Sequence, residues 1–399
     1  MAGRDYKDFV RSVFAPLADA AQRPELLDRL TTAPVVEERK ADQFSRFKTF
    51  KFDASEVVYI PNGGFVSFYN HSGVRFLAVS SSSFILKDES ELADWAMGRE
   101  IIDEALDEST FLCLAHYLKG YYRLADRFRA PEEAVDVIDV VDDHYSGHPF
   151  SDLISCYRPI FIYRIPPDNM MMDENIFDIA SDLCCHIYSL RSALVDDELA
   201  DAIKRLRALS TVPNENLYQA LTASHYRHVF LELYRCLEAI FYLPWILDLK
   251  RSGGIDTRAI DLREVCRSSL QWREKELPSM EKVFALLNPN EKLDRLEDAI
   301  ILFKDLKNAP DFSRVQIGRR IYAVRNGMVH HEDYDEPNKY KPDDSQWRSI
   351  SLYVALVLEG IARTYQRDLT SDSPAPLQQT ARSHDNSGIR DTGEALEEG

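Results

Sequence analysis

Two hydrophobic periods divide the chain into two parts. From about residue 49 to residue 86, β-branched and aromatic residues come in short runs such as Val57–Ile60 and Phe65–Tyr69, which is typical of strands. The segment Asn70–Gly73 lies between two such runs and predicts a hairpin turn. From Asp173 onward the apolar residues recur every three or four positions, which predicts helices.

The N-terminal part mixes helices with strands. We expect one or two short amphipathic helices within residues 5–30 and another helix at about 88–107. The apolar runs 111–118 and 158–165 predict further strands. The proline-containing segment Ile165–Asn169 interrupts the pattern and ends this part.

Proline, glycine and asparagine punctuate the second part and set its helix boundaries. The expected helices cover residues 173–194, 197–210, 213–250, 258–286 with a break near Pro278, 291–306, 312–331 and 344–368. Residues 371–399 are rich in small and acidic residues, a composition that predicts a disordered tail. We therefore expect an α+β chain, with a mixed α/β domain at residues 1–169 and an all-α helical bundle at 170–370.

Composition narrows the class of protein. The chain has 399 residues, enough for two or possibly three domains, and its formal net charge is −18. Such a charge argues against a protein that coats nucleic acid non-specifically, because that mode needs many cationic contacts. The six cysteines form no Cys-x-x-Cys pair, which favours buried thiols in a reducing compartment over disulfides or zinc.

No membrane or cofactor signal stands out. The N-terminus lacks an apolar signal core, and no run approaches the ~20 apolar residues of a membrane span. We therefore expect a soluble, cytoplasmic protein with no membrane partner and no cofactor. The aspartates at 136, 139, 142 and 143 with His144 have the composition of a metal site, but a solvated strand or helix is the interpretation we favour.

The segment with the most chemical content is Arg325–His330. It places an arginine, an asparagine and a histidine at the end of a predicted helix. The surrounding stretch from Ser313 to His331 holds four arginines and two histidines without an acidic residue, against the acidic background of the chain. These residue types favour a site that binds a phosphodiester and transfers protons over a helix that only packs.

This Arg-Asn-x-x-x-His pattern resembles the signature of the HEPN superfamily, whose helical domains include many metal-independent RNases. The resemblance covers roughly residues 175 to 369. The motif lies in the next-to-last predicted helix, and the earlier segment Phe230–Phe241 is similar to the family's acid-containing second helix, with Glu238 as its acid and Tyr234 four positions before it. The resemblance implies an RNA substrate, a homodimer and products that end in a 2′,3′-cyclic phosphate and a 5′-hydroxyl.

The family pattern also implies roles for individual residues. We assign catalysis to Arg325, His330, Asn326 and Glu238. Histidine can act as general acid or base, arginine can bind phosphate oxygens, and asparagine can orient either group. Substrate contacts are assigned to a further set: Arg319, Arg320, Tyr322 and His331.

The spacing within the motif points to a second subunit. Arg325 and His330 are five positions apart, which is roughly 140° around an ideal helix. In the family, two motif helices face each other across a two-fold axis and share one cleft, so each protomer supplies part of a composite site. The competing interpretation is structural: Arg325 forms a salt bridge, for which Glu238 is the natural partner, and His330 caps the helix.

The resemblance further implies a biological role. Proteins of this build act as toxins or abortive-infection effectors in antiviral defence against phage. The N-terminal domain would then be a sensor or regulator that responds to a phage-derived trigger or a regulatory partner. The alternative function is a non-catalytic HEPN-like module for dimerisation or for binding a nucleotide or RNA.

Overall fold

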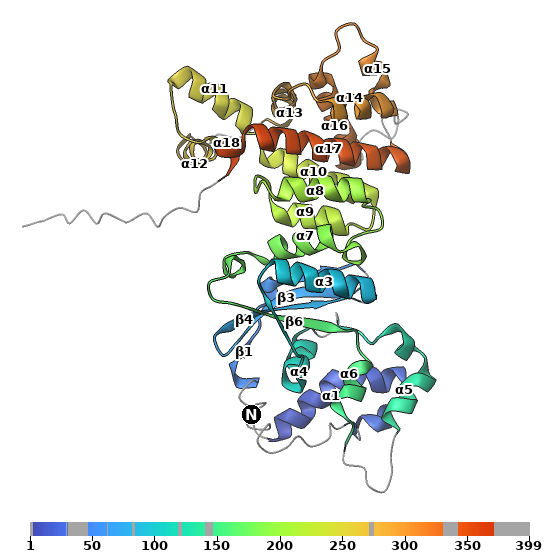
Figure 1. Cartoon of the computed structure of the whole chain (residues 1–399). Coiled ribbons are helices and arrows are strands. Elements are labelled where there is room, and N and C mark those ends of the chain that lie inside the picture. Colours follow the sequence, from blue (N-terminus) through green and yellow to red (C-terminus); the bar gives the residue numbers. More distant parts are fainter. Residues whose placement is uncertain are drawn as a thin grey trace, which may run out of the picture.

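The structure of the chain is a computed structural model. It describes residues 3–28, 30, 47–61, 63–81, 84–118, 122–139, 147–270, 275–329 and 342–370. Within these ranges an antiparallel sheet occupies the N-terminal part and helices make up the rest, which confirms the α+β class (Figure 1).

The sheet has six antiparallel strands. They are β1 (Phe50–Lys51), β2 (Val57–Ile60), β3 (Gly64–His71), β4 (Val74–Ser80), β5 (Ile102–Glu104) and β6 (Ile160–Ile165). The strand order is β1-β3-β4-β6-β5, and β2 also pairs with β3. The central strands β3, β4 and β6 form the longest pairings, so they carry the sheet's core on both faces.

The β3–β4 hairpin confirms the predicted turn. His71 pairs with Val74, and the two residues between them, Ser72 and Gly73, have φ values of 52° and 81°. A two-residue loop with positive φ at both positions matches the right-handed twist of the strands that it joins. Glycine suits the second position because it adopts positive φ without steric cost.

Helices cover both faces of the sheet (Figure 1). One face packs against helices of the N-terminal part, namely α1 (Gly3–Ala20), α4 (Glu108–Tyr117), α5 (Pro131–Ile138) and α6 (Phe150–Ser155). The other face packs against α3 (Leu86–Gly98) and α7 (Ile176–His186). Along β3 the side chains alternate accordingly, with Phe65 and Tyr69 in the first core and Val66 and Phe68 in the second.

The second core continues from the sheet into the helical part without a break, since one hydrophobic cluster includes β3, α7 and the long helix α17. The remaining helices are α8 (Asp197–Arg207), α9 (Asn214–Thr222), α10 (Tyr226–Ala239), α11 (Leu243–Gly253), α12 (Ala259–Leu270), α13 (Glu276–Ala285), α14 (Glu291–Ala299), α15 (Lys304–Lys307), α16 (Arg314–Val329), α17 (Asp344–Thr364) and α18 (Gln366–Leu369). The N-terminal and helical parts therefore share one hydrophobic core.

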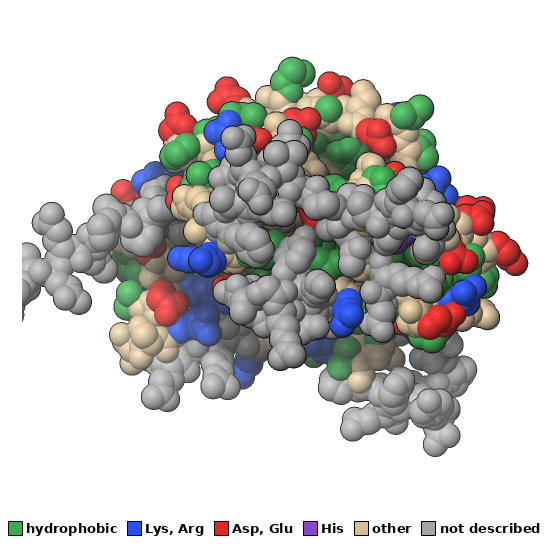
Figure 2. Space-filling view, turned by 90° about the horizontal axis from the view of Figure 1, so that it is seen from below, with side chains coloured by type: hydrophobic (Ala, Val, Ile, Leu, Met, Phe, Trp, Pro, Cys, Tyr) green, Lys and Arg blue, Asp and Glu red, His purple; other side chains and the backbone are tan. Residues whose placement is uncertain are grey.

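Short 3-10 turns connect several of these elements. They are η1 (Pro24–Asp28), η2 (Ala54–Glu56), η3 (Asp126–Arg129), η4 (Met170–Met172), η5 (Tyr188–Leu190) and η6 (Ile301–Phe303). Seen from the N-terminal end, the described surface shows acidic, basic and hydrophobic side chains interspersed (Figure 2). None of the helices described is long and apolar enough to cross a membrane.

One predicted strand is wrong. The run at 111–118 belongs to α4, whose first turn is capped by the Asp107 carboxylate, which accepts hydrogen bonds from the backbone of Ser109 and Thr110. Most of α4 is buried, so it is apolar on nearly every side. A short helix of this kind lacks the polar face that separates helix from strand in a sequence.

Several predicted helix boundaries are also wrong. The segment predicted as one helix at 213–250 forms three, because His225 caps the start of α10 and Leu243–Pro244 begins α11. The helix predicted at 88–107 ends at Gly98, and β5 follows. The segment predicted at 258–286 with a break near Pro278 forms two helices, α12 and α13, and Pro278 lies in the first turn of α13, where its missing N–H leaves no bond unmade.

The acidic run at 136–144 is only partly described. Asp136 lies in α5 and Asp139 follows its last turn, whereas residues 142–144 lie outside the described residues. Across the described ranges, no cluster of three or more His, Cys, Asp or Glu side chains has a geometry that could hold a metal ion. All six cysteines are buried.

Candidate functional site

Helix α16 carries the motif from Arg325 to Val329 and packs closely on α13. The contact depends on Gly318, since a Cβ at this position would come within 2.9 Å of the Phe284 ring. Ile317, Ile321 and Val324 are buried on the same helix, as their spacing predicts. Close packing by this face fixes the rotation of α16 and so directs Arg325 toward α10 and α13.

Arg325 lies among carboxylates from two other helices. Its Nη2 donates to Oε1 of Glu238 in α10 at 3.2 Å, and its Nη1 lies 3.6 Å from Oε2 of Glu276 in α13. Nη1 also donates to Oδ1 of the neighbouring Asn326 at 3.0 Å. The Arg325 side chain keeps 17% of its surface exposed, so it is not fully enclosed by these partners.

An aromatic ring completes the contacts of Arg325. The guanidinium carbon is 5.5 Å from the centre of the Tyr234 ring, a distance at which a cation is attracted to the face of the ring. Tyr234 and Glu238 are four positions apart on α10, so they present the ring and the carboxylate on the same face. Arg325, Glu238, Glu276, Asn326 and Tyr234 are called the Arg325 cluster below.

The surroundings change the acidity of two groups in this cluster. Burial is the largest influence on Glu238 and raises its pKa, Arg325 opposes this shift, and Glu276 adds to it. Glu238 therefore takes up a proton more readily than an exposed glutamate as the pH falls, which weakens its hold on Arg325. Burial also raises the pKa of Tyr234, so its hydroxyl stays protonated and is available as a donor.

The Tyr234 hydroxyl is buried and has no hydrogen-bond partner among the residues that the structure describes. The residue as a whole is 1% exposed. A buried hydroxyl without a partner loses its hydration and receives nothing in return.

We expect Tyr234→Phe to leave the free energy of unfolding unchanged or to raise it by up to about 1 kcal/mol, because the unpaired hydroxyl contributes only a desolvation cost. Urea unfolding of the full chain measures this effect. A loss of more than about 1 kcal/mol would show instead that the hydroxyl has a partner in the folded protein.

The other arginines of α16 have separate ion-pair partners. Arg319 donates to Glu281 at 2.6 Å, and Arg320 binds the Asp305 carboxylate and the Leu302 carbonyl. Arg320 is buried, so it has a clear role in holding η6 and α15 against α16. The arginines of this basic stretch therefore form ion pairs with acidic side chains of the preceding helices.

Of the other residues assigned from the sequence, Tyr322 is described in the structure and the two histidines are not. Tyr322 is partly buried and packs against the core of the helical part. His330 and His331 both lie outside the described residues. The structure thus brings Arg325, Asn326 and Glu238 together and leaves the two histidines undescribed.

Sequence reasoning missed Glu276 as a member of the cluster. It is the first residue of α13 and lies 49 positions before Arg325 by its number, so only the packing of α13 on α16 brings the two together. Its sole sequence signal is an acidic residue at a helix start, where the helix dipole favours negative charge. That signal is too common to single out a site.

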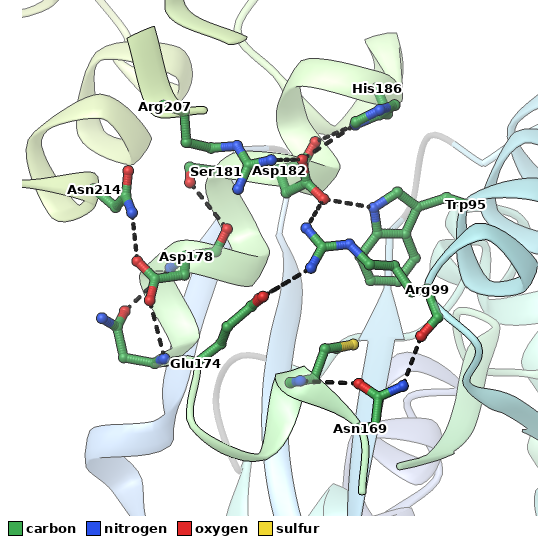
Figure 3. Close-up of polar contacts among 12 residues, drawn as sticks. Trp95, Arg99, Asn169, Glu174, Asp178, Ser181, Asp182, His186, Arg207 and Asn214 are labelled. Atoms are coloured by element: carbon green, nitrogen blue, oxygen red, sulfur yellow. Dashed lines mark hydrogen bonds and ion pairs between the residues drawn. The ribbon is translucent and has the colours of Figure 1, made fainter. Parts of the chain in front are cut away.

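A second polar cluster connects the N-terminal part to the helical part (Figure 3). Asp182 of α7 is almost fully buried and accepts hydrogen bonds from Arg99, at the end of α3, and from Arg207 in α8. The Trp95 indole donates to the same carboxylate at 3.0 Å, and His186 lies beside it. Three separate elements therefore meet at one buried charge.

The two guanidiniums determine the ionisation of this carboxyl. Burial is the largest influence and would raise the pKa of Asp182, but Arg207 and Arg99 outweigh it and hold the pKa below its usual range. Asp182 is therefore ionised at neutral pH. Its partner Arg99 also forms an ion pair with Glu174 at 2.9 Å, which extends the network toward the surface.

Comparison of this chain with protein-family models, with curated proteins and with solved structures finds no match.

Proposed function

We propose that the chain is a metal-independent endoribonuclease of HEPN type, which acts in the cytoplasm as a toxin or anti-phage effector. The observation that carries the proposal is the Arg325 cluster. It joins the arginine of the motif to the acid of the helix that resembles the family's second helix, with Asn326 in contact and His330 four positions beyond.

Each group of the proposed site has a chemical role. Arg325 binds the phosphate and stabilises the charge that develops on it, since a guanidinium offers a fixed fork of donors. His330 takes the proton of the ribose 2′-hydroxyl or protonates the leaving oxygen. Glu238 and Asn326 orient the guanidinium. In this role neither side chain contacts the RNA directly.

The carboxylates around Arg325 also set a condition for binding. The contact with Glu276 is longer than that with Glu238, and the Glu276 side chain is 46% exposed. A phosphate would therefore replace Glu276 more readily than Glu238. In this proposal Glu238 holds Arg325 in place, while Glu276 occupies the phosphate position until RNA arrives.

The proposed site is completed by a second copy of the chain. On an ideal helix the five-residue spacing of Arg325 and His330 directs them to different sides, and a two-fold axis would bring Arg325 of one copy near His330 of the other. The N-terminal part would restrain or trigger this dimer in response to a phage-derived or regulatory partner.

The shared core affects how this regulation can be tested. α7 packs on β2, β3 and α3, so removal of residues 1–169 would expose its buried face. A change of activity in such a truncated chain would therefore combine the effect of misfolding with that of lost regulation. Point substitutions that keep the core are the better test.

A second candidate is a non-catalytic module that dimerises or binds a nucleotide or RNA. One observation favours it: Arg325 already pairs with two carboxylates, as a purely structural arginine would.

Incubation of the purified full-length protein with total RNA separates the two candidates. The endoribonuclease shortens the RNA, and Arg325→Ala and His330→Ala do not. A binding module retards RNA on a native gel and leaves its length unchanged, and that result would overturn the proposal.

A further inference from the structure

A groove of about 490 Å³ lies at the β5 edge of the sheet, between α3 and strands β5 and β6. Its floor is apolar and includes Phe161 and Tyr163, which alternate along β6 and face α3. Two apolar side chains at its rim are strongly exposed, with Met97 at 71% and Ile102 at 42% of their surface. Neither residue belongs to the Arg325 cluster or to the Asp182 network.

The charged side chains that line this groove all have the same sign. They are Glu89 and Glu100 from the α3 side and Asp103 from β5. An apolar floor with an acidic rim favours a ligand that carries apolar and cationic side chains together, and it disfavours RNA or another polyanion.

The strand beside the groove is the last of the sheet. β5 pairs with β6 on one side, and the order of described strands ends there. Exposed strand edges are sites where an added strand can form main-chain hydrogen bonds, and soluble proteins usually protect them. A strand added at such an edge directs every second side chain to the same face, which here is the face with the groove.

The backbone at the rim of the groove also has an unusual conformation at Glu100. Glu100 lies two residues after the last residue of α3 and has a φ of 56°, and its N–H and that of Ile101 close the helix by donating to the carbonyls of Met97 and Ala96. Glycine is the residue that normally occupies this left-handed position, because a side chain there is strained. The chain instead places a carboxylate there, at the mouth of the groove, where stability alone would favour glycine.

We propose that this groove binds an extended basic segment of a partner protein, which adds a strand to β5. Apolar side chains of the segment lie between α3 and β6, and its lysines or arginines meet Glu89, Glu100 and Asp103. The proposal goes beyond RNA cleavage and stands on different residues, so either can fail without the other.

A labelled short peptide in which serine fills every second position and valine and lysine take turns at the others, so that both face the groove, tests the proposal by fluorescence anisotropy with the full-length protein. We expect it to bind, and the same peptide with glutamate in place of lysine to bind at least about tenfold more weakly, because like charges are opposed at the rim. N-methylation of alternate backbone amides removes main-chain donors and should also weaken binding about tenfold.

Glu100→Gly is the most informative variant, because its predicted effects on folding and on binding are opposite. The melting temperature should stay equal or rise, since glycine relieves the strained φ. The Kd for the lysine peptide should rise about three- to fivefold with the loss of one exposed charge contact. Asp103→Lys should weaken binding further, whereas Glu264→Lys, the same reversal at an exposed site on α12, should not change it.

Three results would overturn the proposal. They are a lysine peptide that does not bind the wild-type protein, a Kd that Glu100→Gly and Asp103→Lys leave unchanged, and equal weakening by Glu264→Lys. The last would show attraction to the overall negative charge of the chain and not to this groove.

Discussion

Replacing either Arg325 or His330 with alanine should lower the rate of RNA cleavage by about 100-fold or more. Arg325 supplies the positive charge at the phosphate, and His330 supplies the proton transfer, so each variant removes one part of the transition-state stabilisation. Arg325 is partly exposed and sits at the end of α16, so the fold should survive its loss. Steady-state cleavage of a fluorogenic RNA measures the rates.

A mixture of the two inactive variants gives a sharper result. If the site is shared between subunits, a dimer with one Arg325→Ala chain and one His330→Ala chain retains one complete site of two. Random exchange makes half of the dimers mixed, so activity should recover to about a quarter of the wild-type value. Separate tags on the two chains would confirm that mixed dimers form.

Arg295→Ala is the matched control for these variants. Arg295 lies on α14, is 78% exposed and forms an ion pair with Glu291. Its removal should change cleavage by less than about threefold, because an exposed pair contributes little. Mixed dimers that stay inactive would contradict the shared site, and a folded His330→Ala protein that still cleaves would contradict the role of His330.

Asp182→Asn should lower the free energy of unfolding by about 3 kcal/mol, because it leaves two guanidiniums beside a buried neutral group. In the wild-type protein the Asp182 carboxylate of α7 binds side chains at α3 and α8. Its loss therefore weakens the contact between the N-terminal part and the helical part. Urea unfolding followed by far-UV circular dichroism measures the change. Asp173→Asn, a nearby exposed aspartate, should change it by less than about 0.5 kcal/mol.

The same substitution should alter the dependence of stability on pH. The pKa of Asp182 is lower in the folded than in the unfolded chain, so the unfolded chain binds more protons as the pH falls. Its contribution is fully present above the unfolded pKa of about 4 and is lost as the pH drops through the folded value. Asp182→Asn should therefore flatten the acid limb of the stability curve, and an unchanged limb would contradict the role of Asp182.

Local structure was predictable where a residue type has one strong conformational or burial preference. The hairpin at Ser72–Gly73 followed from its turn residues, and the apolar face of α16 followed from the spacing of Ile317, Ile321 and Val324. Contact between Arg325 and Glu238 was also foreseen, because both residues belong to the pattern that resembles the HEPN superfamily.

Features that depend on packing were not predictable. The buried helix α4 has no polar face, so its sequence is typical of a strand. Glu276 and Asp182 acquire their partners only when helices distant in sequence come together. The continuation of the second core from the sheet into the helical part was missed for the same reason, since it depends on the packing of α7 on β2 and β3.

The end groups of the RNA products test the central claim most directly. Purified full-length protein is incubated with an RNA oligonucleotide of defined sequence in the presence of EDTA, and the products are identified by mass spectrometry. We predict fragments that end in a 2′,3′-cyclic phosphate and begin with a 5′-hydroxyl, formed by the wild-type protein and not by Arg325→Ala. Intact RNA, or fragments with a 5′-phosphate and a 3′-hydroxyl, would contradict the account.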